Sequence, residues 1–427
     1  MHSLMNFLQG SPNAMFAVHN MAKQLLDGGY EELPLRGAWT VHWGGRYFVR
    51  INDSALIAFA LPEQMPDEDC PFYRIISAHT DQPCLRIKPS PQMKVQGYGK
   101  LNAEVYGGPI YSTWLDRPLS LAGRLTLRSK DPFYPEVRLI DFQEPILIIP
   151  NMAIHLNREV NSGYALNPQV DLLPVGACVS ELETESDFFW DAVKSQFGIS
   201  PAQILDFDLF TYVTEPPQLV GFEREFLSAS RLDDLSLVWA GVSALMEATP
   251  QTGVNVLAAL DHEEVGSRTP QGAASAMFGM IMEKMSAALG RIRTEYMDDL
   301  VGSFMISADV AHAVHPNHPE KHDPVCRPVL NGGPVIKLAA GQSYMTQSNE
   351  YAVYQSICED LHIPVQKFVN RSDMRGGSTL GPVMAANFPC RILDMGIPIL
   401  SMHSARELMG VQDFKFTKSS FIGFYNL

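Results

Sequence analysis

The chain has 427 residues, of which 46% are hydrophobic and 19% charged, with a formal net charge of −15 at pH 7. This composition is typical of a folded globular protein long enough for more than one domain, and it excludes a disordered chain. The acidic balance argues against nucleic acid or an anionic membrane surface as a partner.

The N-terminal stretch, residues 1–29, has apolar positions at a helical period, and we expect one helix there. It lacks the basic start and continuous apolar core of a signal peptide. Elsewhere, too, no segment approaches the roughly 20 uninterrupted apolar residues of a membrane span. Six cysteines are scattered singly, which predicts reduced thiols in a cytoplasmic protein. They are Cys70, Cys84, Cys178, Cys326, Cys358 and Cys390.

Three apolar segments after this helix predict strands at 46–52, 54–61 and 73–79. Residues 90–227 differ, because short alternating or β-rich runs are separated by turns and interrupted by one predicted helix at 187–198. From Ser228 onward, helical and strand patterns alternate. Helices are expected at 235–248 and 273–289, and strands at 254–260 and 303–310.

This order predicts an α/β fold: a mixed, largely parallel sheet sandwiched by helices, with an inserted β-rich domain. Residues 1–89 and 228–427 would form one discontinuous domain, and residues 90–227 would be the insertion. Such an insertion is tolerated where its two ends lie close together.

Acids and histidines follow five of the predicted strand or loop ends. The residues are His79 with Asp81, Asp233 with Asp234, Glu263 with Glu264, Asp309, and His403. Each has an ordinary structural explanation, such as a hydrogen-bonded loop histidine or acids in the first turn of a helix. Five such ends at one edge of a sheet are hard to explain without a cation, because neighbouring carboxylates repel one another.

Two histidines and several carboxylates form a ligand set that suits zinc or another borderline divalent metal. Two ions that share one carboxylate need about five ligands, which His79, Asp233, Glu264, Asp309 and His403 supply. The adjacent Glu263 is then left to act as general base on water, which loses a proton more readily beside a cation.

Seven motifs in this order resemble the aspartyl aminopeptidases, which are cytosolic di-zinc peptidases that remove N-terminal Asp or Glu from peptides. They are HTDQP, SRLDDLS, DHEEVGS, SADVAHAVHPNH, GPVIK, GGSTLGP and MHSARE. The resemblance runs from about Asn6 to the C-terminus and includes IPNMAIHLNR in the inserted region. It implies a zinc-aminopeptidase-like catalytic domain, and an inserted domain that builds dimers into a tetrahedral dodecamer.

Residue by residue, the resemblance makes His79, Asp233, Glu264, Asp309 and His403 the ligands of two zinc ions per subunit, with Asp233 bridging. Cobalt or manganese would suit similar ligands. It further implies that Glu263 is the general base acting on a metal-bridged hydroxide, and that Asp81 orients His79. His155 would reach the active site of a neighbouring subunit. Lys337 and Tyr344 would hold the acidic residue of the substrate.

Four positions depart from the family pattern. Asp234 and His262 stand where Asn is frequent, and Gly341 and Ser343 stand where some relatives have larger basic residues. Two other readings remain: a di-zinc hydrolase of different specificity on the same scaffold, and a non-enzymatic module with a structural metal. The spare carboxylate argues against the second, since a structural site uses all of its acids as ligands. His312, His315, His318 and His322 are expected to be mostly loop residues.

Overall fold

The computed structural model describes residues 1–66, 71–179 and 187–427. They form two compact units. Unit 1 comprises Met1–Asp81, Pro217–Met402 and Glu407–Leu427, and unit 2 comprises Gln82–Pro216 and His403–Arg406. None of the five cysteines in the described ranges forms a disulfide, and Cys70 lies outside them.

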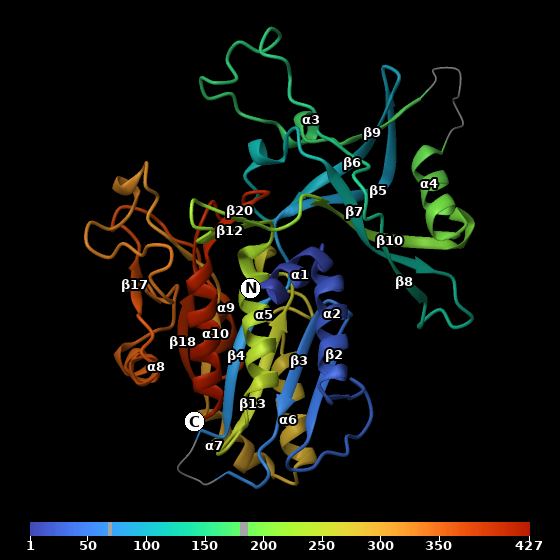
Figure 1. Ribbon diagram of the computed structural model, residues 1–427. Helices are drawn as coiled ribbons and strands as arrows, with labels where there is room; N and C mark the ends of the chain where they lie inside the picture. The colour runs from blue at the N-terminus through green and yellow to red at the C-terminus, as the bar shows by residue number, and fades with distance from the viewer. Residues whose placement is uncertain (67–70, 180–186) are drawn as a thin grey trace. The chain divides into compact units, whose positions relative to one another are not determined.

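Unit 1 is built on a nine-stranded sheet whose four central strands are mutually parallel (Figure 1). Antiparallel pairs occur only toward the two sides, at β2–β3, β3–β13 and β16–β18, among the described residues. In spatial order the strands are β1 (Glu31–Glu32), β2 (Arg46–Ile51), β3 (Ala55–Ala60), β13 (Val254–Leu260), β4 (Tyr73–His79), β14 (Phe304–Ala308), β18 (Arg391–Gly396), β16 (Val335–Leu338) and β17 (Gln366–Val369).

Helices cover both faces of this sheet. One face packs against α1 (His2–Gly10), α2 (Ala14–Asp27), α5 (Leu232–Glu247), α8 (Ser348–Asp360) and α10 (Val411–Tyr425). The other packs against α6 (Met277–Ala288), α7 (Arg293–Gly302) and α9 (Leu380–Ala385). Side chains of a strand alternate between the faces, so Ile76 belongs to the first cluster and Ile75 to the second. The predicted fold class, a mixed sheet between helices, is confirmed.

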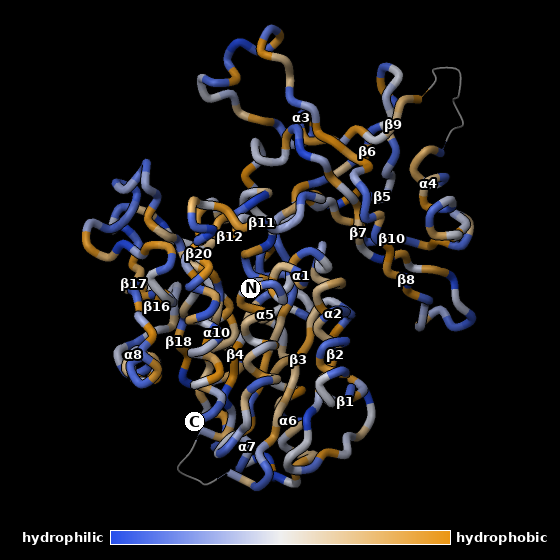
Figure 2. Tube along the Cα trace, viewed as in Figure 1, coloured by the Kyte–Doolittle hydropathy of each residue, from blue (hydrophilic) through white to orange (hydrophobic). Residues whose placement is uncertain are grey.

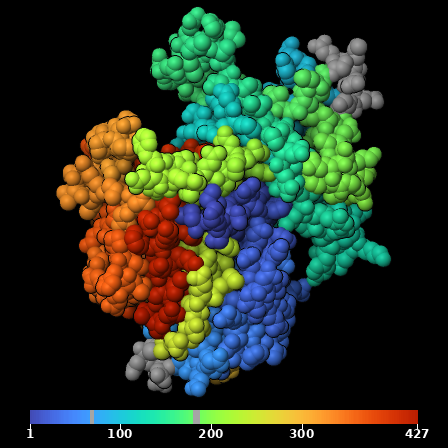
Figure 3. Space-filling model, viewed as in Figure 1, coloured from blue at the N-terminus to red at the C-terminus, as the bar shows by residue number. Residues whose placement is uncertain are grey.

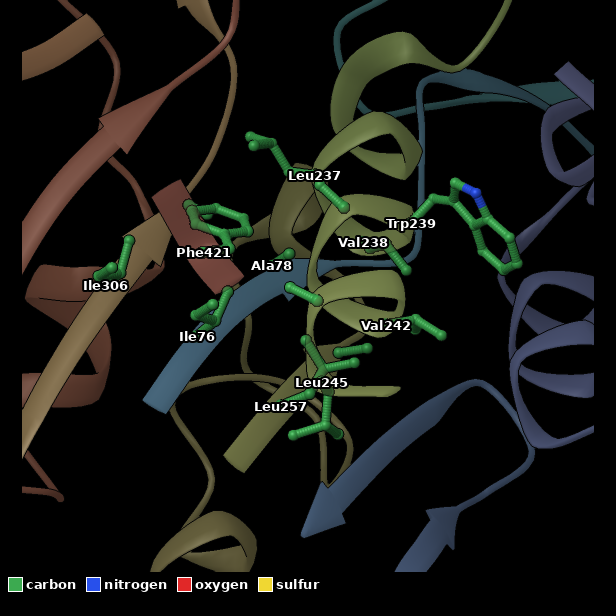
Figure 4. Close-up of a cluster of buried hydrophobic side chains, with 14 of the residues drawn as sticks. Ile76, Ala78, Leu237, Val238, Trp239, Val242, Leu245, Leu257, Ile306 and Phe421 are labelled. Atoms are coloured by element: carbon green, nitrogen blue, oxygen red, sulfur yellow. The ribbon is translucent and has the colours of Figure 1, made fainter. Parts of the chain in front are cut away.

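The centre of the first cluster lies between α5 and strands β4 and β13 (Figure 4). Helix α5 is apolar on nearly all sides and almost wholly buried, as expected for a helix enclosed by a sheet and other helices. Gly241 permits the close approach, because a Cβ atom there would lie 2.7 Å from Leu257 Cδ1. In Figure 3, α1, α5 and α10 adjoin one another although they come from distant parts of the chain.

The single helix expected over residues 1–29 is wrong: the structure has two helices, α1 and α2, separated after Gly10. Pro12 explains the break, because proline lacks an N–H and disfavours helical backbone in the residue before it. Asn13 then caps the second helix, and its side-chain oxygen accepts the Phe16 N–H at 3.2 Å.

Unit 1 also contains a second sheet, which has five strands. It contains β11 (Gln218–Val220), β12 (Phe226–Ala229), β20 (Glu407–Gly410), β19 (Pro398–Leu400) and β15 (Ala311–His312). The apolar run at 392–400 therefore serves two sheets, β18 in the first and β19 in the second. Pairing of β12 with β20 places Ala229 opposite Glu407, just before the acidic pair that opens α5.

Unit 2 contains a six-stranded, wholly antiparallel sheet with its own apolar core. In order the strands are β8 (Glu136–Asp141), β7 (Leu119–Leu127), β10 (Ile204–Val213), β5 (Cys84–Val95), β6 (Tyr98–Tyr106) and β9 (Val175–Cys178), accompanied by α3 (Pro168–Asp171) and α4 (Phe188–Phe197). Within the apolar run at 144–150, Leu147 and Ile148 form only isolated bridges.

In Figure 2, apolar residues lie along the central strands of unit 1, and polar residues occupy many of the loops. None of the helices in the described ranges combines the length and the apolar character that crossing a membrane requires.

Candidate metal centre

The acids and histidine of unit 1 gather where three parallel strands end. Strand β4 ends at His79, which is in register with Leu260, the last residue of β13. Strand β14 ends at Ala308, and Asp309 follows directly. Because neighbouring parallel strands point the same way, the loops after them meet at one edge of the sheet, where open α/β folds bind ligands.

His79 is held by carboxylates on both sides of its ring, and its side chain is buried. Its Nδ1 lies 3.1 Å from the carbonyl oxygen of Asp81 and 3.4 Å from Oδ1 of the same residue. With Nδ1 donating its proton there, Nε2 is the nitrogen that is set up to coordinate a metal. That nitrogen lies 3.2 Å from Oδ1 of Asp233.

Asp81 also fixes the loop that carries the two glutamates. Its Oδ1 accepts the backbone N–H of Glu263 at 3.0 Å, and its Oδ2 accepts that of Glu264 at 3.2 Å. The residue before them, His262, has a left-handed backbone with φ of 62°. Asp81 therefore orients the histidine and also holds the backbone of both glutamates in place.

Asp233 and Asp234 are both buried at the start of α5 and are joined by a cis peptide bond. The N–H of Asp233 donates to Oε2 of Glu407 at 3.1 Å. Oδ2 of Asp234 accepts the N–H of His79 at 3.0 Å, and its Oδ1 is buried and receives no hydrogen bond from the described residues. Sequence reasoning missed the contacts of Asp234 and Glu407; neither residue type nor spacing distinguished them.

Two groups of ligand atoms share His79. One consists of His79, Asp233, Asp234 and Asp309, and the other of His79, Glu263 and Glu264; within each group, the atoms lie within 4.8 Å of one another. Imidazole nitrogen with carboxylate oxygens is a donor set that zinc accepts. Burial of so many acids together is otherwise costly, so the residues present fit a bound cation.

The pKa values of the clustered acids and of His79 also support a bound cation. Burial, helped by nearby Asp309 and Asp233 and opposed by His79, raises the pKa of Glu263 to about 7. Burial likewise raises the pKa of Asp234 and of Asp309. Burial alone would lower the pKa of His79, but the surrounding carboxylates, Asp234 foremost, raise it well above its usual value. A divalent cation would relieve the repulsion that drives these shifts.

In metal-stripped protein, Glu263 is expected to make stability depend on pH. Its pKa rises from 4.5 when unfolded to about 7 when folded, so the folded state binds the extra proton between these values. The free energy of unfolding should therefore fall as pH rises from 4.5 to 7. Urea denaturation of stripped wild type and stripped Glu263→Gln at several pH values checks this. The free energy of unfolding of the variant should fall less steeply with pH than that of wild type. Equal slopes would show that Glu263 is not the group that titrates.

Lys337 lies beside this cluster as a buried cation. Its Nζ is 3.4 Å from Oδ1 of Asp309, and the residue is only 4% exposed. The ammonium also lies 5.5 Å from the centre of the Tyr344 ring. Although burial opposes the charge, Asp309 and other acids raise the pKa of Lys337 overall, so the side chain stays protonated.

The remaining predicted site residues belong to unit 2. His155 lies in an exposed turn of a long loop. His403 is partly buried, and its Nδ1 lies 3.1 Å from the carbonyl oxygen of Gly108, which leaves Nε2 as its potential ligand atom. Of the expected loop histidines, His312 instead lies in β15. His315, His318 and His322 lie on an irregular segment of unit 1, where the His315 and His318 rings are 5.2 Å apart.

The sequence and the fold both match known proteins. A model of the aminopeptidase I zinc metalloprotease (M18) family matches residues 7–425. A probable M18 family aminopeptidase 2 of Clostridium acetobutylicum is 46% identical over 425 residues, covering 99% of this chain and 98% of the relative. A structure of the Ape4 and Nbr1 complex matches with a TM-score of 0.93 at 33% identity, covering 99% of this chain and 85% of that chain.

The dodecamer of mApe1 from S. cerevisiae matches with a TM-score of 0.85 at 25% identity, covering 99% of this chain and 95% of that chain. The family model and the Clostridium relative both span nearly the whole sequence, and the ligand atoms in unit 1 suit the metal named in the family's description. The chain therefore belongs to the M18 family of zinc metalloaminopeptidases.

Proposed function

We propose that this protein is an aspartyl aminopeptidase that removes N-terminal aspartate or glutamate from peptides. The observation that carries the proposal is the arrangement of Glu263 and Glu264 on Asp81, beside His79. A purely structural metal site has no reason to hold one more carboxylate than its metals need, whereas a hydrolase needs a base next to its ligands.

Five residues are proposed to hold two zinc ions, with Asp233 shared between them: His79, Asp233, Glu264, Asp309 and His403. Cobalt or manganese would be accepted by a similar donor set. Zinc, when bound, would polarise the scissile carbonyl and lower the pKa of the attacking water. Asp81 holds His79 in the required tautomer and keeps the glutamate loop in place.

Glu263 is proposed to move the proton. Its carboxylate takes the proton from the attacking water and returns it to the departing amine, which is general base and then general acid catalysis by one group. Burial, which raises its pKa to about 7, suits it to both steps near neutral pH. His155 of a neighbouring copy is proposed to donate a hydrogen bond to the substrate's carbonyl oxygen as negative charge develops there.

Lys337 and Tyr344 are proposed to recognise the acidic side chain of the substrate. The Lys337 ammonium has three N–H donors, and its ion pair with Asp309 does not require all of them. A substrate carboxylate would complete its contacts with a charge-assisted hydrogen bond. A substrate with a neutral side chain would offer no carboxylate to this buried lysine N–H. The unmade hydrogen bond would disfavour binding of neutral substrates.

Hydrolysis of paired dipeptides tests the proposal. Asp-Ala should be cleaved in preference to Leu-Ala, activity should vanish after chelation, and zinc should restore it. Lys337→Met should lower kcat/KM for Asp-Ala by about tenfold or more, the value of one charged hydrogen bond, and leave Leu-Ala little changed. Metal-dependent preference for Leu-Ala would contradict the acidic specificity, and cleavage of neither peptide would contradict the aminopeptidase assignment.

Unit 1 is proposed to be the catalytic part and unit 2 to mediate self-association. One of the matching solved structures is a dodecamer, which supports a comparable assembly here, with dimers building to a tetrahedral dodecamer. If His155 acts on a neighbouring copy, activity requires that assembly. A cytoplasmic location is part of the same proposal. Peptides and other copies of the chain are the partners; nucleic acid and membranes are not.

A further inference from the structure

Asp394 is a buried carboxylate that the proposed mechanism does not use. It lies in the middle of β18 and is 0% exposed. Burial raises its pKa, while hydrogen bonds and the charge of Lys337 oppose that rise. A buried carboxylate lowers the stability of the fold unless its oxygens accept hydrogen bonds. The hydrogen-bond donors to Asp394 therefore indicate its structural role.

Each carboxylate oxygen of Asp394 binds a different segment. Oδ2 accepts the backbone N–H of Met345 at 2.5 Å, and Oδ1 accepts the hydroxyl of Thr379 at 2.6 Å. Thr346 adds two further bonds to the backbone: its hydroxyl accepts the Asp394 N–H at 2.8 Å and lies 3.2 Å from the Asp394 carbonyl oxygen. The segment directly after Tyr344 is thereby fixed to the sheet.

The helix α9 is fixed to the same carboxylate. Thr379 precedes its first residue, and the Gly381 N–H donates to Oγ of Ser307 at 2.9 Å. A Cβ atom on Gly381 would lie 2.8 Å from both oxygens of Asp394, so glycine is what lets the helix approach so closely. Asp394 therefore joins β18 to the segment directly after Tyr344 and to the start of α9.

We propose that Asp394 is a positioning residue for recognition of the substrate's N-terminal side chain. By holding the Tyr344–Thr346 segment and the start of α9, it keeps the Tyr344 ring against the Lys337 ammonium. The inference rests on the proposed acidic specificity and deepens it. It attributes this positioning to the hydrogen bonds of Asp394 and not to its negative charge.

Asp394→Ala and Asp394→Asn distinguish these two contributions. Alanine removes both acceptors. Asparagine keeps both contacts, since its oxygen accepts the Met345 N–H and its amide donates to the Thr379 hydroxyl, which can rotate to accept. A single hydrogen bond of this kind corresponds to about tenfold in kcat/KM. Asp394→Ala should therefore lower the ratio of kcat/KM for Asp-Ala to kcat/KM for Asn-Ala at least about tenfold, mostly by raising KM for Asp-Ala. Asp394→Asn should restore the ratio.

Two further variants keep the test decisive if Asp394→Ala folds poorly. Gly381→Ala forces the carboxylate away without removing it and should lower the same ratio. Asp413→Ala is the matched control: Asp413 is equally buried and accepts the N–H groups of Asn331 at 2.6 Å and Gly333 at 2.8 Å, away from Tyr344. It should lower the thermal midpoint but keep the wild-type ratio.

The outcomes separate this inference from the proposed function. If zinc-loaded wild type prefers Asp-Ala but folded Asp394→Ala and Gly381→Ala keep that preference, the positioning role is wrong. If Asp394→Asn behaves like Asp394→Ala, the charge is what acts and the hydrogen-bond account is wrong. If wild type itself does not distinguish Asp-Ala from Asn-Ala, the acidic specificity fails, and the role of Asp394 fails with it.

Discussion

Replacing Glu263 by glutamine is expected to lower kcat on Asp-Ala by about 10²–10⁴-fold, the usual contribution of a general base. Glutamine has nearly the same shape, and the bond between Asp81 and the residue 263 backbone N–H is kept. What is lost is the ability to accept and return a proton. Zinc content, measured on the same preparation, should stay at the wild-type value.

Glu264→Gln is the matched comparison for this variant. The two residues are neighbours, and Asp81 accepts the backbone N–H of each. Glu264 is the proposed ligand, so its amide variant should lose zinc as well as activity, and excess zinc should recover part of the activity. Excess zinc should do nothing for Glu263→Gln. If Glu263→Gln lost its zinc, or if its kcat stayed near wild type, the division of roles between the two glutamates would be wrong.

Asp233→Asn is expected to have the second large effect, on metal binding itself. Loss of an outer partner of a metal ligand costs about 10–100-fold in affinity, and loss of a carboxylate shared by two ions should cost more. Asp233 is buried and faces Nε2 of His79 at 3.2 Å, so an amide there would place a weak ligand where a charged one is needed. Zinc dissociation constants from competition with a chelating dye measure the loss.

Asp234→Asn controls for the change of an acid to an amide at this place. Its oxygen could still accept the His79 N–H, as Oδ2 of Asp234 does at 3.0 Å. The ligand assignment therefore predicts that Asp234→Asn keeps zinc and activity far better than Asp233→Asn. The reverse order of the two variants would show that Asp234, which lies in the same group of ligand atoms, is the true bridge.

The sequence was enough to predict that acids and a histidine meet at one sheet edge. Burial of the strands before His79, Glu263 and Asp309 is visible as apolar runs, and parallel strands necessarily end on the same side. The sequence could not show that Asp81 accepts hydrogen bonds from the glutamate loop, because that contact joins segments 182 residues apart. Only its orienting effect on His79 was predicted, whereas the roles of His155 and Lys337 came from resemblance alone.

Other differences have simple physical causes. The split of the first helix follows from Pro12 and Asn13, whose effects on helices outweigh an apolar period that continues across them. Asp394 was missed because a single acid within an apolar strand has no pattern around it. Its function in the fold comes from Met345 and Thr379, which only the tertiary structure brings to it.

A zinc titration of the metal-stripped protein, with Asp-Ala hydrolysis followed at each addition, shows whether catalysis needs two bound ions. Stripped protein should have no activity, and full activity should appear only when the second equivalent of zinc per chain has bound. Glu263→Gln should bind the same two equivalents without gaining activity. Full activity with one equivalent, or activity in protein that holds no metal, would contradict the account.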